Sequence, residues 1–241
     1  MSKILKSILF HSSFLVCYMM TCCGQNNMAI PKEFKETPIP KKESKEWFKL
    51  NYSKNDFKVN IVNNKLVIEK NTEKTRECRL ETKSGIFSGT DHGEWGGQLT
   101  FIPNDSQNTI TIKKGNIKFI FLYKGKVYFI EGFAHMGINE GTIYEVNTKE
   151  HNLPYKKVVD FDDAAQAFTI YKDKLLIAAY KNFYIVKDFK KEIVFKNTFW
   201  QGLYPNSIAA FNNENVFIGI RSGIVKLDLT KKTLKFYKNA K

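Results

Sequence analysis

The sequence contains little cysteine. Of its four cysteines, Cys17, Cys22 and Cys23 fall within the first 23 residues, so Cys78 is the single thiol in the rest of the chain. This count excludes a disulfide framework inside the domain. The chain also lacks a CxxC pair or a Cys/His cluster of the kind that builds a structural zinc site. We therefore expect a fold that is stabilised by its own hydrophobic core, without a metal.

Arginine is also scarce. The chain has a formal net charge of +14, yet only Arg76, Arg79 and Arg221 are arginines, and the lysines are scattered along the sequence. Phosphate and base recognition favours the planar guanidinium fork over the lysine ammonium group. The composition therefore argues against nucleic acid as a partner and is typical of a generally solvated, lysine-rich surface.

No apolar run at the N-terminus is long enough to span a membrane. The stretch over residues 8–20 is interrupted by His11, Ser12 and Ser13, whereas a spanning helix needs about 20 apolar residues to cross roughly 30 Å of hydrocarbon. Lys3 and Lys6 precede the stretch, with no acidic residue nearby. A positive start followed by a short apolar segment predicts a cleaved secretory signal peptide over residues 1–22.

The residues that follow, Met19-Met20-Thr21-Cys22-Cys23-Gly24-Gln25, resemble a bacterial lipobox. In this motif a cysteine is lipidated and becomes the first residue of the mature chain. The resemblance implies a lipid anchor on Cys23, or on Cys22 as the alternative, so that the membrane is a partner of the protein. An ordinary signal peptide with incidental cysteines is the competing interpretation. Because no acidic residue follows the cysteine directly, we expect the outer membrane of a bacterial cell envelope.

Residues 23–45 are polar, with Pro31, Pro38 and Pro40 placed among lysines and glutamates. Such a segment buries too little apolar surface to order itself, and its prolines stiffen it. The composition predicts a flexible tether between the lipid and the fold. One domain is expected over residues 46–241, with folded structure beginning at Trp47 and enough residues for a sizeable core.

Convincing helical periodicity is absent from this domain, apart from one expected turn over residues 162–168. Short apolar runs rich in Ile, Val, Phe and Tyr recur between Asn, Gly, Lys and Asp turns, which predicts an almost entirely β structure. Asn63-Asn64, between two such runs, predicts a tight hairpin.

A repeat runs through the predicted strands. Gly89, Glu131, Ala178 and Gly219 occupy equivalent positions in four units and are 42, 47 and 41 residues apart. A four-stranded unit at this spacing is typical of a β-propeller blade. We therefore predict an all-β, β-propeller-like fold with about four to five blades of four-stranded sheets, in which residues 47–70 supply three strands of a fifth blade or help to close the ring. A β-sandwich is the alternative.

Residues 217–228, Phe-Ile-Gly-Ile-Arg-Ser-Gly-Ile-Val-Lys-Leu-Asp, also resemble the repeat of the sensor-type propellers of two-component regulators. Gly89-Thr90-Asp91-His92-Gly93 matches the centre of that repeat more closely. The resemblance covers roughly residues 78–239. It implies the propeller fold but no particular activity, because propellers host many unrelated functions.

One face of such a fold collects the unusual residues. When the strands of a blade run outward from the centre, the second-to-third turns and the connections between blades share a face. The enlarged turns at residues 90–97 and 132–141 and the connections at residues 159–163 and 199–206 fall there. Aromatic side chains beside carboxylates on loops suit peptide or carbohydrate recognition. The predicted binding residues are Asp91, His92, Glu94, Trp95, His135, Glu140, Asp160, Asp162, Trp200 and Tyr204.

Several of these residues also have a structural interpretation. Trp95 and Trp200 would equally suit gaps between blades, and His92 would suit a hydrogen bond to a backbone carbonyl. Asp162 and Asp163 would suit the cap of a short helical turn.

Three classes of function remain. The leading hypothesis is a non-catalytic envelope module that binds a protein, peptide or glycan. The alternative is a hydrolase or lyase that uses two carboxylates, or a metal held by His92 and His135; against it, the chain lacks the GxSxG and HExxH motifs. The third is an immunity-type or structural envelope protein. No cofactor follows from the sequence. The carboxylates for the enzyme hypothesis are Asp91, Glu94, Glu131, Asp160 and Asp162.

Overall fold

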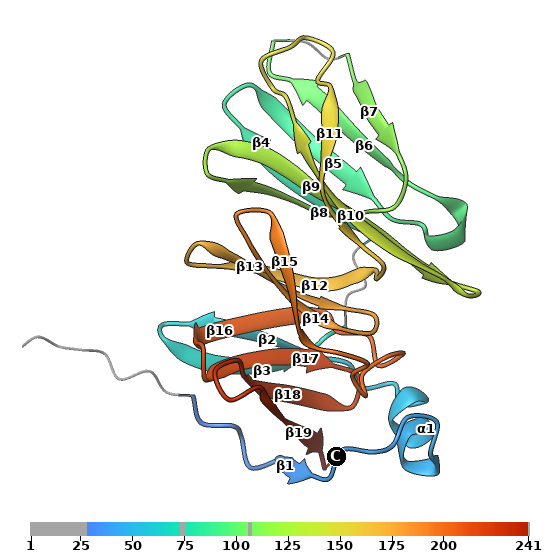
Figure 1. Cartoon of the computed structure of the whole chain (residues 1–241), viewed down its shortest axis with the longest axis vertical. Helices are drawn as coiled ribbons and strands as arrows, with labels where there is room; N and C mark the ends of the chain where they lie inside the picture. The colour runs from blue at the N-terminus through green and yellow to red at the C-terminus, as the bar shows by residue number, and fades with distance from the viewer. Residues whose placement is uncertain (1–27, 73–75, 106–107, 241) are drawn as a thin grey trace, which may run out of the picture.

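The computed structural model describes residues 28–72, 76–105 and 108–240 (Figure 1). Strands dominate this part of the chain, and no helix in it is long and apolar enough to cross a membrane. Cys22 and Cys23, the predicted lipidation sites, lie outside the described residues, as does the predicted signal peptide.

Four antiparallel meanders form the body of the protein, and we call them blades 1 to 4. In each blade, four strands pair in chain order. Blade 1 contains β4 (Glu77–Thr82), β5 (Gly85–Thr90), β6 (Gln98–Pro103) and β7 (Ile110–Lys114). Blade 2 contains β8 (Ile117–Tyr123), β9 (Lys126–His135), β10 (Ile138–Val146) and β11 (Tyr155–Phe161). Blade 3 contains β12 (Ala165–Tyr171), β13 (Lys174–Ala179), β14 (Phe183–Lys187) and β15 (Lys190–Phe195). Blade 4 contains β16 (Ser207–Asn212), β17 (Asn215–Ile220), β18 (Gly223–Asp228) and β19 (Thr233–Asn239).

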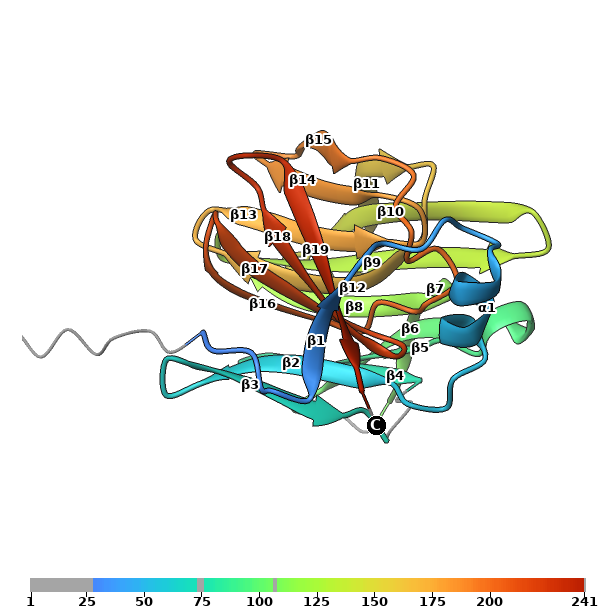
Figure 2. The ribbon, with the colours of Figure 1, turned by 90° about the horizontal axis from the view of Figure 1, so that it is seen from below.

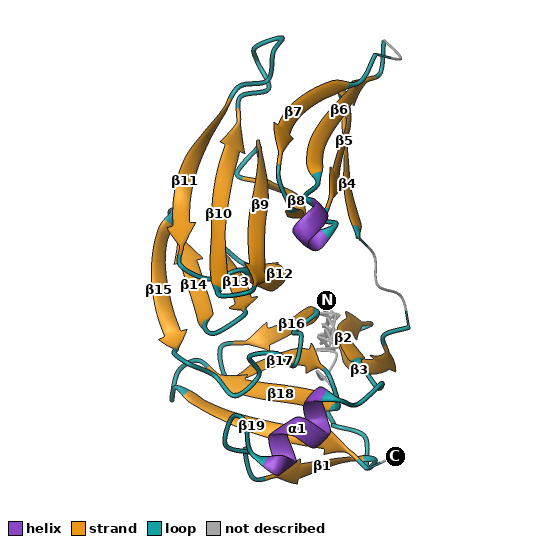
Figure 3. Ribbon diagram, turned by 90° about the vertical axis from the view of Figure 1, so that its right-hand side faces the viewer, coloured by secondary structure: helices purple, strands orange, loops and turns teal. Residues whose placement is uncertain are grey.

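The first strands of the blades lie around a common centre. β4 packs on β8, β8 contacts β12, β12 packs on β16, and β16 packs on β2 of a separate hairpin, β2 (Phe57–Val62) and β3 (Lys65–Lys70). Figure 3 shows the resulting arc of sheets. The all-β, propeller-like prediction is confirmed, with four full blades and a two-stranded hairpin as the fifth unit. The β-sandwich alternative is not adopted, and the described sheets do not close into a single ring of paired strands.

The hydrophobic core is divided among the interfaces between neighbouring sheets. One buried cluster joins blades 1 and 2 and includes Phe87 and Phe129. Further clusters join blades 2 and 3, blades 3 and 4, and blade 4 and the β2–β3 hairpin. Because apolar burial contributes about 25 cal/mol for each Å² removed from water, each sheet is held mainly by the sheets next to it, and blade 1 and the β2–β3 hairpin at the ends of the arc share one such cluster each.

The four equivalent positions of the repeat lie on the second strands of the blades, and two of them carry a glycine for a steric reason. Gly89, Glu131, Ala178 and Gly219 lie on β5, β9, β13 and β17, the second strand of each blade, as the spacing predicted. A Cβ atom at Gly89 would lie 2.5 Å from Cγ2 of Ile117 on β8, and one at Gly219 would lie 2.3 Å from the Phe57 carbonyl oxygen on β2. At these two positions glycine lets the first strand of the next unit approach.

The segment before the blades is folded onto blade 4. β1 (Phe34–Thr37) pairs antiparallel with β19 and becomes the fifth strand of that sheet (Figure 2). The Phe34 side chain is buried and meets the Phe57 ring edge-on, with the ring centroids 5.0 Å apart. The prediction of a flexible tether over residues 23–45 is therefore wrong for Phe34–Thr37, because one aromatic side chain among the charged residues gives this strand a place in the core.

A short helix follows where strands were expected. α1 (Lys45–Asn51) begins at Ser44, whose Oγ accepts a hydrogen bond from the Trp47 backbone N–H at 3.2 Å. Trp47 and Leu50 are buried against blades 3 and 4. Residues 47–70 thus supply α1 and two strands, not three. The helical turn expected over residues 162–168 is also wrong, because β12 begins at Ala165. The Asn63-Asn64 hairpin is confirmed, with both residues in the left-handed region at φ 49° and 58°.

Candidate binding face

The turns from second to third strands and the connections between blades meet on one face. Around the β11–β12 connection, Asp163 accepts hydrogen bonds from the Asn139 amide on β10 and from the Lys181 backbone N–H in the β13–β14 turn, both at 2.9 Å. Figure 2 shows the β5–β6 connection and the β9–β10 hairpin projecting from the side on which α1 lies. The predicted grouping of these loops therefore holds for blades 1 to 3.

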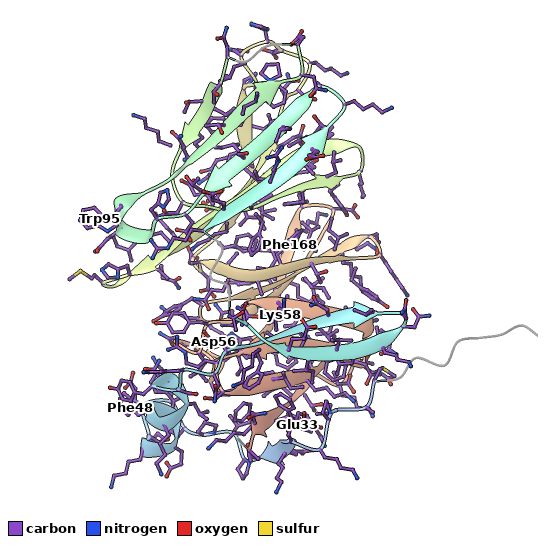
Figure 4. All side chains as sticks on the ribbon, turned by 180° about the vertical axis from the view of Figure 1, so that it is seen from behind. Glu33, Phe48, Asp56, Lys58, Trp95 and Phe168 are labelled. Atoms are coloured by element: carbon purple, nitrogen blue, oxygen red, sulfur yellow. The ribbon has the colours of Figure 1, made fainter. Side chains whose placement is uncertain are left out.

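Two neighbouring projections carry strongly exposed large apolar side chains. The β5–β6 connection contains η1 (Gly93–Trp95), a 3-10 turn that presents Trp95 with 83% of its surface exposed. The β9–β10 hairpin presents Met136 and Ile138, which are 88% and 53% exposed. In Figure 4, Trp95 lies at the outer end of its connection. We call Trp95, Met136 and Ile138 the apolar rim.

A contact between a glutamate and a histidine side chain joins the two projections. Glu94 Oε2 lies 3.3 Å from His135 Nε2, and both side chains are about half exposed. The contact crosses from blade 1 to blade 2, so two predicted binding residues meet although they are 41 positions apart. The contact places η1, which carries Trp95, beside the hairpin that carries Met136.

The turn over residues 132–141 is not an enlarged loop. β9 and β10 pair without interruption from Val127–Val146 to His135–Ile138, so the hairpin is closed by Met136 and Gly137 alone. A Cβ atom at Gly141 would lie 2.5 Å from the Asp163 carbonyl oxygen. Gly141 lets the β11–β12 connection approach β10 closely, and it is not part of a turn. Glu140 is exposed on β10, opposite Phe133.

Trp200 is not part of the binding face. Its side chain is fully buried between blades 3 and 4, and its indole N–H donates to the Ala179 carbonyl oxygen at 3.1 Å. The prediction that Trp200 is an exposed binding residue is therefore wrong. The connection that carries it is lined with apolar residues that pack inward, namely Phe199 and Leu203.

The acidic pair after β11 divides into one exposed and one buried carboxylate. Asp162 is exposed, as predicted. Asp163 is fully buried and accepts hydrogen bonds from Asn139 and Lys181 and from both the backbone and the side chain of Asn182. Burial raises the pKa of Asp163, and these hydrogen bonds act in the opposite direction. Asp163 joins blades 2 and 3, a role that the sequence analysis missed.

Other predicted residues take part in ordinary ion pairs. Asp160, on the outermost strand of blade 2, accepts hydrogen bonds from Lys157 Nζ at 2.8 Å and Thr142 Oγ1 at 2.9 Å, and Lys157 lowers its pKa. Asp91 accepts from Lys118 Nζ and from the Gly93 backbone N–H. These contacts tie the two carboxylates to their own and the neighbouring blade.

A hollow of about 1030 Å³ lies at the centre of the arc, and we call it the central cavity. The first strand of every unit contributes to its wall, from Lys58 on β2 to Ser207 on β16. Asp91, His92 and Tyr204 line it, so three predicted residues face this space and not the apolar rim. Tyr204 is 49% exposed, and the Arg221 guanidinium carbon lies 4.3 Å from its ring centre.

Comparison with known proteins gives no family. No protein-family model and no curated protein sequence matches this chain. Among solved structures, apo AztD from Citrobacter koseri is similar at 14% sequence identity with a TM-score of 0.41. The similarity covers 74% of this chain and 51% of AztD, so the chain spans about half the length of that protein. The proposal of a function therefore rests on the geometry of the site itself.

Several candidate residues of the enzyme hypothesis have partners in the part of the chain that the structure describes. No group of three or more His, Cys, Asp and Glu side chains there could hold a metal ion. Three candidate carboxylates of the enzyme hypothesis are engaged by lysines: Asp91 by Lys118, Asp160 by Lys157, and Glu131 by Lys113 at 2.9 Å. Cys78 is unbonded to other cysteines, and burial raises the pKa of its thiol to about 11, which makes it a poor nucleophile near neutral pH.

Proposed function

We propose that the protein is a non-catalytic binding module of the bacterial cell envelope that captures a protein or peptide partner through the apolar rim. The observation that carries the proposal is the exposure of Trp95, Met136 and Ile138 on two neighbouring projections. Trp is strongly enriched among the residues that dominate binding energy, and methionine adapts to irregular partner surfaces. An exposed cluster of this kind is more typical of an interaction site than of a solvated surface.

The conformation of Met136 supports the same proposal. Met136 and Gly137 have φ values of 46° and 90°, the pattern of a type I′ turn. Asn or Gly normally occupies the first of these positions, because other L-residues are disfavoured in the left-handed region by about 1 to 2 kcal/mol. A large apolar side chain at the exposed tip therefore lowers stability and adds no burial, which is understandable if the side chain contacts a partner.

The partner is expected to be a protein or peptide with an apolar groove. Met136 and Ile138 offer aliphatic surface without the hydrogen-bonding groups that a glycan would need at the same points. Glu94 and His135 provide the polar border beside them. A glycan partner is the competing outcome, and it would rely on Trp95 stacking alone.

The N-terminal sequence is the reason for placing the protein in the cell envelope. The apolar stretch over residues 8–20 and the lipobox-like residues at Cys22 and Cys23 support export and lipid anchoring. β1 begins at Phe34, so ten residues separate Cys23 from the first strand. Fully extended, that length reaches about 35 Å, which keeps the fold near the membrane.

Replacing Trp95 with alanine is expected to weaken partner capture by about 30-fold, equivalent to about 2 kcal/mol. The full-length protein, tagged at its C-terminus and extracted in mild detergent, would be used to capture partners from envelope extract. Ile193→Ala is the matched control, because Ile193 is 43% exposed on β15, away from the rim. Equal capture by wild type and Trp95→Ala, or an equal loss in the control, would contradict the proposal.

A further inference from the structure

The central cavity has the properties of a ligand site that is separate from the apolar rim. Its volume of about 1030 Å³ lies just above the roughly 300–1,000 Å³ typical of small-molecule sites. All five sheets contribute to its wall, so its shape is fixed by the packing of the whole arc.

Its charged side chains leave hydrogen-bond donors in excess. Lys58, Arg76, Lys118 and Arg221 line it, against Asp56, Glu77 and Asp91. Two of the three acids are already engaged, because Asp56 Oδ1 accepts from Arg221 Nε at 3.1 Å and Asp91 accepts from Lys118. An ammonium group has three N–H donors and a guanidinium group has five, so Lys118 and Arg221 retain donors that these acids do not use.

Arg221 is held in place before any ligand arrives. Besides its bond to Asp56, its Nη1 donates to the Asn51 carbonyl oxygen at 2.6 Å, and its plane lies against the Tyr204 ring. The side chain is only 17% exposed. A guanidinium fixed in this way loses little conformational entropy when it binds a carboxylate.

One acceptor in the wall has no donor. Gln166, on the first strand of blade 3, lines the cavity, and its Oε1 is buried without a hydrogen bond from any residue that the structure describes. A buried acceptor without a donor is unfavourable. Rotation of the Gln166 side-chain amide would turn Oε1 toward the cavity, where a hydroxyl or N–H group of a ligand would donate to it.

We propose that the central cavity binds a small organic anion that carries hydroxyl groups, of the class of acidic sugars. A carboxylate would be bound by the donors of Arg221 or of Lys118, a hydroxyl would donate to Gln166 Oε1, and the partly exposed Tyr204 ring would contact the sugar ring. A neutral sugar has no carboxylate for the basic side chains, and inorganic phosphate has no ring to contact Tyr204.

Calorimetry on the full-length protein in detergent tests this with glucuronate, glucose and inorganic phosphate. Glucuronate is expected to bind at least about 10-fold more tightly than either of the others, the ratio that about 1.4 kcal/mol of added contact supplies. Binding should also slow the alkylation of Cys78, which lines the same cavity, at pH 9. Equal binding of glucose or phosphate, absent glucuronate binding at millimolar concentration, or unchanged Cys78 alkylation would overturn the proposal.

Gln166→Leu separates binding from folding. It removes the acceptor that lacks a donor, so the thermal midpoint is expected to stay equal or rise, while glucuronate affinity falls about 5-fold with the loss of one hydrogen bond. Lys187→Met is the control, because it removes a basic side chain that pairs with Asp173 outside the cavity. Unchanged affinity in Gln166→Leu, or an equal loss in Lys187→Met, would contradict the assignment. Partner capture by the apolar rim should be unaffected in both variants.

Discussion

Replacing Trp200 with alanine is expected to lower the free energy of unfolding by about 3 to 5 kcal/mol, the cost typical of removing a buried tryptophan from a packed core. The indole is fully buried between blades 3 and 4, and the substitution also leaves the Ala179 carbonyl oxygen without its donor. Denaturant unfolding followed by far-ultraviolet circular dichroism would measure the change.

Trp95→Ala is the matched control for this measurement. Trp95 is 83% exposed, so its loss should change the free energy of unfolding by no more than about 0.5 kcal/mol. The same substitution at two tryptophans should thus affect the fold at one and partner capture at the other. A small change at Trp200, or a large change at Trp95, would contradict the division between core and rim.

Asp163→Asn is expected to destabilise the fold by about 1 to 3 kcal/mol although it preserves the size of the side chain. The groups around the carboxylate are mainly donors, namely the Asn139 and Asn182 amides and the Lys181 and Asn182 backbone N–H groups. An asparagine side chain would place its own NH₂ against some of them, so buried donors would lose their acceptor. Thermal unfolding of the purified variant checks the change.

Asp162→Asn provides the adjacent control. Asp162 is exposed. Its substitution should therefore change the free energy of unfolding by no more than about 0.5 kcal/mol, the range of ordinary surface substitutions. If the two variants unfolded alike, Asp163 would not be the link between blades 2 and 3.

The repeat could be predicted because each blade packs against the next unit in the same way. The second strand of one unit meets the first strand of the next, and this close approach selects small residues such as Gly89 and Gly219. Their spacing is therefore visible in the sequence. The Asn63-Asn64 turn was predictable for a local reason, since asparagine tolerates the left-handed region that the hairpin needs.

The elements before the blades could not be predicted in the same way. α1 spans only seven residues, too few for an apolar period to appear. Its stability comes from the burial of Trp47 and Leu50 against blades 3 and 4. β1 has one buried side chain, Phe34, among charged neighbours. Local composition therefore favoured a tether, and the long-range pairing with β19 decided the structure.

The arrangement of the loops was predicted more accurately than the burial of their individual side chains. Trp95 and Trp200 both lie in connections on the predicted face, yet only packing determines which one is exposed. The same holds for Asp162 and Asp163. The glycines at 132 and 141 suggested a loop, whereas they lie in paired strands where another connection approaches closely. Chain topology is readable from sequence spacing, but side-chain burial depends on contacts between distant residues.

Replacing Met136 with asparagine tests most directly the claim that the apolar rim is kept for binding. Asparagine suits the first position of a type I′ turn, so the free energy of unfolding should rise by about 0.5 to 1 kcal/mol. Capture of the partner should fall, because the variant removes the most exposed apolar side chain of the rim. Greater stability together with weaker capture is the predicted result. Unchanged capture by the stabilised variant would contradict the account.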